Sequence, residues 1–135
     1  MIVVDASVVL DLVLGPRSPA GDTLHTRLRA NEVVCAPHLL DAEVGQALHR
    51  LSLHGELSDS EAESMLTDFL NLRITRYAHD WVLARAFELR ANVTVYDALY
   101  LALAEVLDCR LLTGDEALDR VPGCRAEVEV LATTA

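Results

Sequence analysis

The sequence predicts an α/β protein with a central, mainly parallel sheet of four to five strands flanked by helices. Short β-branched runs alternate with longer helical patterns along the chain, which is the order found in parallel-sheet proteins. Apolar residues make up 52% and charged residues 24% of the chain, a balance typical of compact soluble proteins. A chain of 135 residues is long enough to bury a core. We therefore expect residues 1–135 to form a single domain.

The first third of the chain predicts one strand and two helices. The run 2–5 is a strand, and the apolar positions of 6–14 suit a buried helix that Gly15 closes. Ser18 is suited to be the N-cap of a second helix, with Pro19 at its first position. A strand therefore feeds directly into a helix at the start of the chain.

The middle third continues the alternation. The run 32–37 is a strand stopped by its proline, and the leucine spacing over 38–54 predicts a helix that ends at Gly55. The next helix has two alternative capping boxes, and the pattern leaves the choice open: Ser58 with Glu61, or Ser60 with Glu63.

The last third contains the most apolar helix. The stretch "TVYDALYLALAEVL" is apolar on nearly all sides, which predicts a helix covered by other elements. The remaining elements are strands over 73–78, 109–115 and 127–132, an amphipathic helix over 79–92, and a short helix over 116–121.

Composition excludes several classes of protein. The chain has no lysine, whereas P-loop proteins, Schiff-base enzymes and phosphoryl-accepting α/β domains depend on one. No G-x-G-x-x-G follows the first strand, so a dinucleotide-binding fold is not supported. Three widely spaced cysteines predict reduced core thiols, not disulfides or a zinc site; they are Cys35, Cys109 and Cys124.

Charge and hydropathy also limit location and partners. Every apolar run is shorter than a membrane span and no basic segment precedes the first strand, so we expect a cytoplasmic protein without a membrane helix. The net charge of −10 repels nucleic acid at long range. A nucleic acid substrate would therefore be held locally, by metal and a few arginines, while a basic protein partner would be attracted.

Two acids follow strands of the expected sheet. Asp5 ends the first strand and Asp115 follows the fourth, and ligands of parallel α/β sheets bind beyond these carboxyl ends. Each acid also has a structural interpretation, Asp5 as the N-cap of the next helix and Asp115 as part of a turn.

Two further acids lie on helices. Asp97 stands three residues after Thr94, a capping-box pattern, yet it also starts a buried helix whose amino end points to the same edge of the sheet. Glu43 lies on an apolar helix face, which is unusual for a carboxylate unless it is paired or binds a metal. Asp41 points elsewhere, and Asp119 is a less favoured fifth oxygen ligand.

The four acids together predict a cation site. Two carboxylates about 5 Å apart repel by roughly 3 kcal/mol at an effective dielectric of about 20, so four ionised groups need a cation between them. Carboxylate oxygens without histidine or thiolate select a hard ion, which favours Mg²⁺, with Mn²⁺ as the substitute. Such ions commonly serve phosphate chemistry, alone or in pairs.

The segments that carry these acids resemble a known family. "MIVVDASVVLDLVL", Glu43 within "PHLLDAEVGQALHR", and "TVYDALYLALAEVLDCRLLTGDEAL" occur in order over nearly the whole chain. They are similar to the PIN-domain ribonucleases, and most closely to the VapC toxins of bacterial type II toxin–antitoxin pairs. "YDALYLALA" and "LLTGD" are the most specific parts of this likeness.

The resemblance implies a PIN-like three-layer fold and a magnesium-dependent endoribonuclease that acts on RNA. It places Asp5, Glu43, Asp97 and Asp115 on the family's catalytic, metal-binding acids. Ser7 and Thr113 lie where the family often has hydroxyls, which cap helices or bind water or phosphate, with capping slightly favoured. The likeness also implies a VapB-like antitoxin, whose basic and apolar residues cross the acidic groove, and a homodimer.

One alternative from another class stays open. A PIN-like module that has lost catalysis would act only by binding RNA or protein. Such a module is expected to lack one or more of the site acids, and all four are present here. The sequence does not decide the RNA target, the number of metal ions or the identity of the antitoxin.

Overall fold

The computed structural model describes residues 1–15 and 17–134. Its sheet has five strands in the order β3-β2-β1-β4-β5, and each pair of neighbours is parallel. This confirms the predicted α/β class and parallel sheet. The strands are β1 Ile2–Val4, β2 Val34–Pro37, β3 Ile74–Tyr77, β4 Arg110–Thr113 and β5 Val128–Val130.

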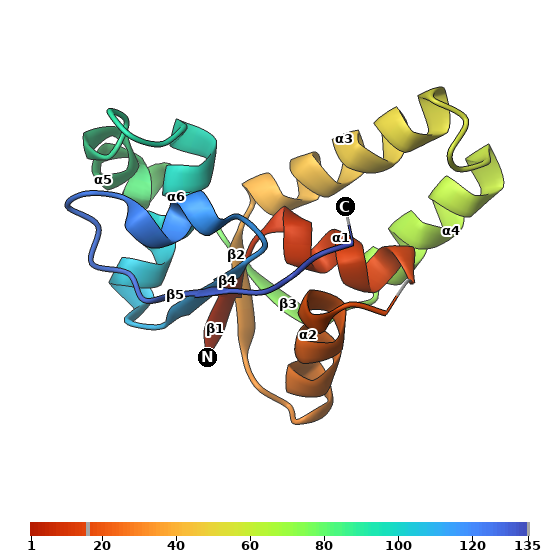
Figure 1. Ribbon diagram of the computed structural model, residues 1–135, viewed down its shortest axis with the longest axis horizontal. Coiled ribbons are helices and arrows are strands. Elements are labelled where there is room, and N and C mark those ends of the chain that lie inside the picture. The colour runs from red at the N-terminus through yellow and green to blue at the C-terminus, as the bar shows by residue number, and fades with distance from the viewer. Residues whose placement is uncertain (16, 135) are drawn as a thin grey trace.

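Helices cover both faces of this sheet (Figure 1). The α-helices are α1 Ala6–Leu14, α2 Pro19–Arg29, α3 Leu39–Leu53, α4 Asp59–Leu70, α5 Leu83–Glu88 and α6 Val95–Leu107. Two 3₁₀ segments, η1 Asp80–Val82 and η2 Glu116–Arg120, complete the described elements. None of the described helices is long and apolar enough to cross a membrane.

The alternation of strand side chains divides the core into two clusters. In β1, Val3 faces a cluster built with α5, α6 and η2, while Ile2 and Val4 face the cluster beneath α1 to α4. In β4, Leu111 and Leu112 divide in the same way. This period-two pattern is what a sheet buried on both faces requires, and it produces the three-layer arrangement.

Helix ends follow the predicted signals closely. Gly15 ends α1 in the left-handed conformation, at φ 92°, and Ser18 caps α2 with Pro19 in its first turn. The choice at α4 is decided by the structure, because Ser58 and Glu61 form both bonds of the capping box. Cys35, Cys109 and Cys124 are free thiols, as predicted.

The helix predicted over 79–92 is wrong in its extent. The segment forms η1 and then the short α5, which ends at Glu88. Leu89 and Arg90 then donate their backbone N–H groups three residues back, to Ala86 and Phe87. These tighter turns bring Leu89, only 4% exposed, into the core. The predicted short helix over 116–121 is likewise a 3₁₀ segment.

Candidate active site

The site lies where the strand order reverses. β1 is flanked by β2 and β4. The chain passes from β1 to β2 and β3 on one side of β1 and then returns from β3 to β4 on its other side. The carboxyl ends of β1 and β4 therefore form a switch point, the usual position of a ligand site in such sheets. Asp5 follows β1 and Asp115 lies two residues after β4, so both stand at this edge.

The structural roles predicted for Asp5 and Asp115 are both present. The Asp5 carboxylate caps α1 by accepting the Val8 N–H at 3.3 Å. The Asp115 carboxylate caps η2 by accepting the Ala117 N–H at 2.9 Å. Capping satisfies backbone donors without neutralising a charge, so it does not account for the gathering of acids described below.

Two hydroxyl groups join Asp5 to the turn that carries Asp115. Ser7 Oγ donates to Asp5 Oδ1 at 2.6 Å and accepts the Gly114 N–H at 3.0 Å. Thr113 Oγ1 donates to Asp5 Oδ2 and accepts the Asp115 N–H at 3.0 Å. Neither hydroxyl is an N-cap, so the slight preference for capping is wrong. Both hold the two acid-bearing segments together.

Asp97 lies in the first turn of α6 and is half-buried. Thr94 is the N-cap, and its hydroxyl accepts the Asp97 N–H at 3.1 Å. Among the described residues, the reciprocal bond from the Thr94 N–H to the Asp97 carboxylate is not formed, unlike the complete box at α4. The helix is therefore capped without using the Asp97 side chain.

Glu43 projects from α3 and is half-buried. Its Oε1 accepts a hydrogen bond from the Tyr100 hydroxyl at 2.6 Å. The competing acid, Asp41, is exposed and pairs with Arg76 at 2.9 Å, which excludes it from the cluster. Tyr100 is a site residue that the sequence interpretation missed. The available signal was its place on α6, three residues after Asp97 and so on the same face.

The four acids share one electrostatic environment. Burial raises the pKa of Asp97, and the negative charges of Asp5 and Asp115 raise it further. Burial raises the pKa of Glu43 against the Tyr100 hydrogen bond, and the negative charges of Asp97 and Asp5 add to the effect of burial. The pKa of Asp5 is raised by burial, against the hydrogen bonds from Ser7 and Thr113. The predicted acids thus come together at one edge.

Within residues 1–15 and 17–134, no basic side chain forms an ion pair with these acids. Of the ion pairs between described residues, none involves Asp5, Glu43, Asp97 or Asp115. Asp115 is exposed, but Asp5 is buried and Glu43 and Asp97 are half-buried. Burying unpaired carboxylates is costly unless they bind a cation or take up protons. The edge of the sheet is therefore a region of uncompensated negative charge.

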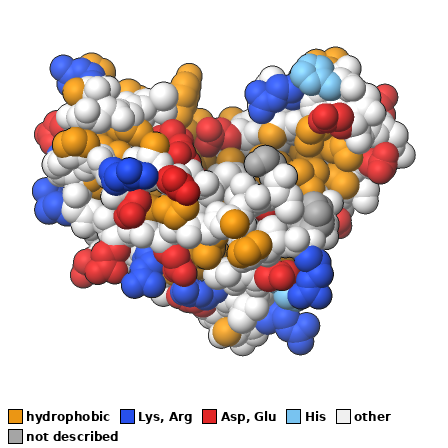
Figure 2. All heavy atoms as spheres, in the orientation of Figure 1, with side chains coloured by type: hydrophobic (Ala, Val, Ile, Leu, Met, Phe, Trp, Pro, Cys, Tyr) orange, Lys and Arg blue, Asp and Glu red, His pale blue; other side chains and the backbone are white. Residues whose placement is uncertain are grey.

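The surface is hollowed at this edge. Figure 2 shows a notch between the α6 side and the arm formed by α3 and α4, with acidic side chains at its floor. An open cavity of ≈ 530 Å³ is lined by Asp97, Asp115 and Arg90, among others. A second, of ≈ 370 Å³, is lined by Glu43 together with Arg50 and Tyr96.

Asp119, the less favoured fifth ligand, lies elsewhere. It is exposed and borders a different cavity, beside Arg110 and the β5 residues Val128 and Glu129. This placement agrees with a surface role for Asp119 and separates it from Asp115, although the two are one helical turn apart in the chain.

The donor set fits a hard cation in its chemistry. Four carboxylates meet without a histidine or thiolate, which is the ligand type that Mg²⁺ and Mn²⁺ prefer. As the side chains stand, no group of three His, Cys, Asp or Glu residues in the described part of the chain is arranged to hold an ion. Ser7 and Thr113 donate to the two oxygens of Asp5, and a carboxylate with about four lone-pair sites can accept such bonds and still bind a cation.

Comparison with known proteins agrees with this arrangement. The family model described as "PIN domain" matches residues 2–123. The chain is 42% identical over 130 residues to Ribonuclease VapC1 of Mycobacterium tuberculosis, covering 96% of each chain. It is 39% identical over 132 residues to Ribonuclease VapC12 of the same organism, covering 98% of this chain and 100% of that protein.

Solved structures share the fold at low sequence identity. VapBC2 from Rickettsia felis, bound to a DNA fragment from its promoter, matches with a TM-score of 0.71 at 16% identity, over 97% of this chain and 99% of that chain. PAE2754 from Pyrobaculum aerophilum matches with a TM-score of 0.73 at 22% identity, over 94% and 87% respectively. The chain therefore belongs to the PIN domain family and, within it, to the VapC group.

Proposed function

We propose that this protein is a magnesium-dependent endoribonuclease and the toxin of a toxin–antitoxin pair. The observation that carries the proposal is the convergence of Asp5, Glu43, Asp97 and Asp115, which have no ion-pair partner in the described part of the chain. The names of the relatives support it, since VapC1 and VapC12 are both called ribonucleases. Carboxylates that gather unpaired at a ligand-binding edge suit a cation that acts on phosphate.

In this proposal the four carboxylates hold Mg²⁺, which Mn²⁺ can replace. The bound ion would supply charge neutralisation at the phosphate and a water that loses its proton near neutral pH. Ser7 and Thr113 keep Asp5 and the Asp115 turn in fixed relative positions through their hydrogen bonds. Tyr100 orients the Glu43 carboxylate by its hydrogen bond, so that Glu43 can accept a proton from water.

Local groups on the cavity walls would hold the RNA against the repulsion of the acidic surface. Arg90 lines the cavity of Asp97 and Asp115, and its guanidinium stacks 4.1 Å from the Phe87 ring centre. Arg50 lines the cavity of Glu43 on the other side. Arginines placed on both sides of the acids can contact phosphates that flank the cleavage point.

The proposed partners follow from the same surface. Several of the matching solved structures are VapBC or toxin–antitoxin complexes, which supports an antitoxin as the partner of this chain. A segment with basic and apolar residues fits the acidic notch, and the net charge of −10 favours the encounter. We also propose a homodimer and a cytoplasmic location, in line with the family resemblance.

A cleavage assay tests the proposal. The purified protein, freed of antitoxin, is incubated with a structured RNA mixture in Mg²⁺ or Mn²⁺, with and without EDTA. The Asp97→Asn variant is compared with Asp41→Asn, which removes an exposed acid of α3 outside the cluster. Asp97→Asn should fold, because Thr94 and not Asp97 provides the α6 cap. Asp41→Asn should fold because Asp41 is exposed.

Cleavage that requires metal, persists in Asp41→Asn and falls about 10³-fold in Asp97→Asn would support the proposal, since a metal contributes several kcal/mol to the transition state. Equal cleavage by both variants would remove Asp97 from the site. RNA binding without cleavage by the wild-type protein would instead favour the alternative, a PIN-like binding module without catalysis.

A further inference from the structure

The segment 131–134 leaves the sheet after β5 and contacts α1 and α2, which lie on one face of the sheet. In Figure 1 this part of the chain runs alongside α1. The Leu131 N–H donates to the Thr113 carbonyl at 2.8 Å, and the Ala20 N–H of α2 donates to the Ala132 carbonyl at 3.1 Å. The segment therefore has backbone contacts both to the end of β4 and to the start of α2.

A buried acid anchors the far end of this segment. Asp11 of α1 is only 1% exposed, and its carboxylate accepts the Thr134 N–H at 2.9 Å and the Thr134 hydroxyl at 3.1 Å. No ion pair to Asp11 is formed within the described residues. A buried carboxyl group is tolerated only where it is hydrogen-bonded, so Thr134 satisfies Asp11 from 123 positions away.

Between these anchors, Thr133 lies close to Gly114, in the turn 113–115 of the candidate site. A β-carbon added at Gly114 would overlap Thr133 Cγ2 and would come within 3.2 Å of Ser7 Oγ. Position 114 therefore has room only for glycine while the segment is in place. Gly114 precedes Asp115 directly, and its N–H is the donor to Ser7 Oγ.

We propose that Asp11 and Thr134 are positioning residues for the candidate site. By anchoring the segment 131–134, they hold Thr133 against Gly114 and so fix the turn 113–115, which carries Asp115 opposite Asp5. The effect on catalysis rests on the proposed nuclease function. The effect on the turn does not, because it concerns only the contacts of the folded chain.

Amide hydrogen exchange tests the positioning role. The Gly114 and Asp115 N–H groups donate to Ser7 Oγ and Thr113 Oγ1 in the folded chain, so they report directly on the turn. Thr134→Val removes the hydroxyl bond to Asp11 at nearly constant volume, and Thr134→Ser keeps it. We expect about ten-fold faster exchange of both amides in Thr134→Val, with wild-type rates in Thr134→Ser. Unchanged exchange in Thr134→Val would overturn the proposal.

A compensating pair tests the contact itself. Gly114→Ala should displace the turn and lower kcat about 30-fold with an unchanged KM, because small misplacements of catalytic groups are costly. Thr133→Ala removes the methyl group that Gly114→Ala meets, so the double variant should recover to within about three-fold of Thr133→Ala alone. No recovery in the double variant would mean that the segment does not act through Gly114.

The two measurements separate this inference from the proposed function. If the wild-type protein cuts no RNA, the nuclease proposal fails, and the exchange rates still decide whether Asp11 and Thr134 fix the turn. If the wild-type protein cuts RNA while Thr134→Val leaves exchange and kcat unchanged, only the positioning role fails. Circular dichroism of each variant confirms that a change in rate does not come from loss of the fold.

Discussion

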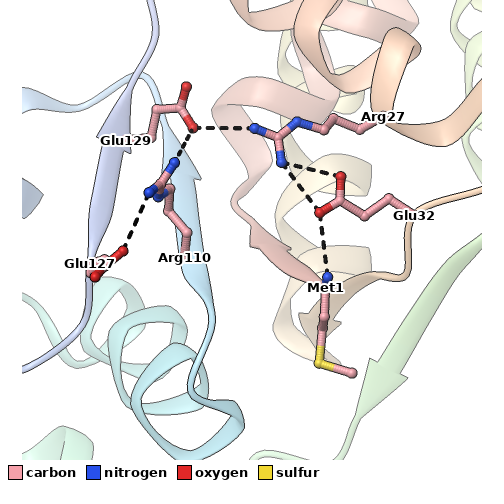
Figure 3. Close-up of polar contacts among 6 residues, drawn as sticks. All are labelled: Met1, Arg27, Glu32, Arg110, Glu127 and Glu129. Atoms are coloured by element: carbon pink, nitrogen blue, oxygen red, sulfur yellow. Dashed lines mark hydrogen bonds and ion pairs between the residues drawn. The ribbon is translucent and has the colours of Figure 1, made fainter. Parts of the chain in front are cut away.

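The two ends of the parallel sheet treat their acidic side chains in opposite ways. Near the amino ends of the strands, acids alternate with basic groups in one connected network (Figure 3). Its contacts are Met1 N–Glu32 at 3.3 Å, Arg27–Glu32 at 3.1 Å, Arg27–Glu129 at 3.6 Å, Arg110–Glu129 at 3.5 Å and Arg110–Glu127 at 3.4 Å. At the carboxyl ends, the four site acids have no such partner among the described residues.

The pKa shifts follow this difference. Burial alone would raise the pKa of Glu32, but Arg27 and the amino terminus outweigh it and the pKa is lowered. Asp97 experiences burial together with negative neighbours, so its pKa is raised. Arg27 and Arg110 thus pair with acids near the amino ends. Among the described residues no arginine forms an ion pair with the site acids, although Arg50 and Arg90 line the nearby cavities, and this leaves a local deficit of positive charge. That deficit is what a bound cation would correct.

The largest expected effect concerns a paired acid on α6, the helix that also carries Asp97. The side chain of Glu105 is only 3% exposed, and its carboxylate accepts a hydrogen bond from Arg85 Nε at 2.8 Å. Arg85→Met leaves this carboxylate buried without its principal partner, which should cost about 3 kcal/mol of unfolding free energy at pH 7. Urea unfolding measures the loss. Arg120→Met, which breaks an exposed pair, should cost under about 0.5 kcal/mol.

The same pair has a defined pH dependence. The Arg85 hydrogen bonds lower the pKa of Glu105 to about 2, against the effect of burial. A lowered acid pKa adds stability above the unfolded value of 4.5, and this stability is lost as the pH falls toward 2. The difference between wild type and Arg85→Met should therefore shrink between about pH 5 and pH 3. A constant difference would show that the pair acts through packing alone.

The next largest effect concerns the carboxyl ends of the strands, where the site acids lie. Tyr100→Phe removes the hydroxyl that orients Glu43, and loss of such a supporting hydrogen bond should lower kcat about ten-fold. KM and thermal stability should change little, because the ring stays in the core. Tyr77→Phe, on β3 and away from the acids, serves as the control. Full activity of Tyr100→Phe would mean that Glu43 needs no support from α6.

A smaller effect is expected from Arg90, which lines the cavity of Asp97 and Asp115. Arg90→Ala should raise KM for RNA about five-fold with kcat unchanged, since a single partly solvated phosphate contact contributes about 1 kcal/mol. The dependence of log KM on log salt should become shallower by about 0.7, as for one phosphate of a single strand. Arg120→Ala, on an exposed turn outside this cavity, should change neither value. An unchanged salt slope in Arg90→Ala would exclude a phosphate contact.

The smallest effect is a gain in stability. Because the pKa of Asp97 is raised in the folded chain, the folded state binds protons more tightly than the unfolded state. Metal-free stability then falls as pH rises from the unfolded value of 3.8 through the higher folded pKa. Asp97→Asn should therefore raise the metal-free melting temperature by about 3 °C at pH 7 and not at pH 4. A lower melting temperature at pH 7 would contradict the account of mutual repulsion.

The elements of the fold could be predicted where local signals decide them. The β-branched runs predicted five strands, and the cap at Ser18 is a local hydrogen bond that the chain encodes within a few residues. At α4 the local pattern left two capping boxes open, and the structure has the one at Ser58. The extent of α5 could not be predicted in this way. Its helical pattern continues through 89–92, but the chain turns at Leu89 and Arg90, where Leu89 is buried in the core.

The proximity of the four acids could be predicted because strand ends and the first turns of helices place them at one edge, while their role as catalytic metal ligands stays a prediction. The contacts that support these acids could not be predicted, although the family resemblance had pointed to Ser7 and Thr113. Ser7 and Thr113 contact groups 107 and 108 positions away, and Tyr100 has the sequence context of an ordinary core residue until α3 is packed beside it. Asp11 likewise gains its partner only when the segment after β5 crosses α1.

The most direct test of the cation site is calorimetric titration with Mn²⁺. The wild-type protein and two matched variants are titrated in the same way. Asp115→Asn and Asp119→Asn each remove one acid from η2, and asparagine can still cap this segment. We expect Asp115→Asn to weaken Mn²⁺ binding at least about ten-fold, and Asp119→Asn, which borders another cavity, to bind as the wild type does. Equal affinities in all three proteins would contradict a cation site among the unpaired acids.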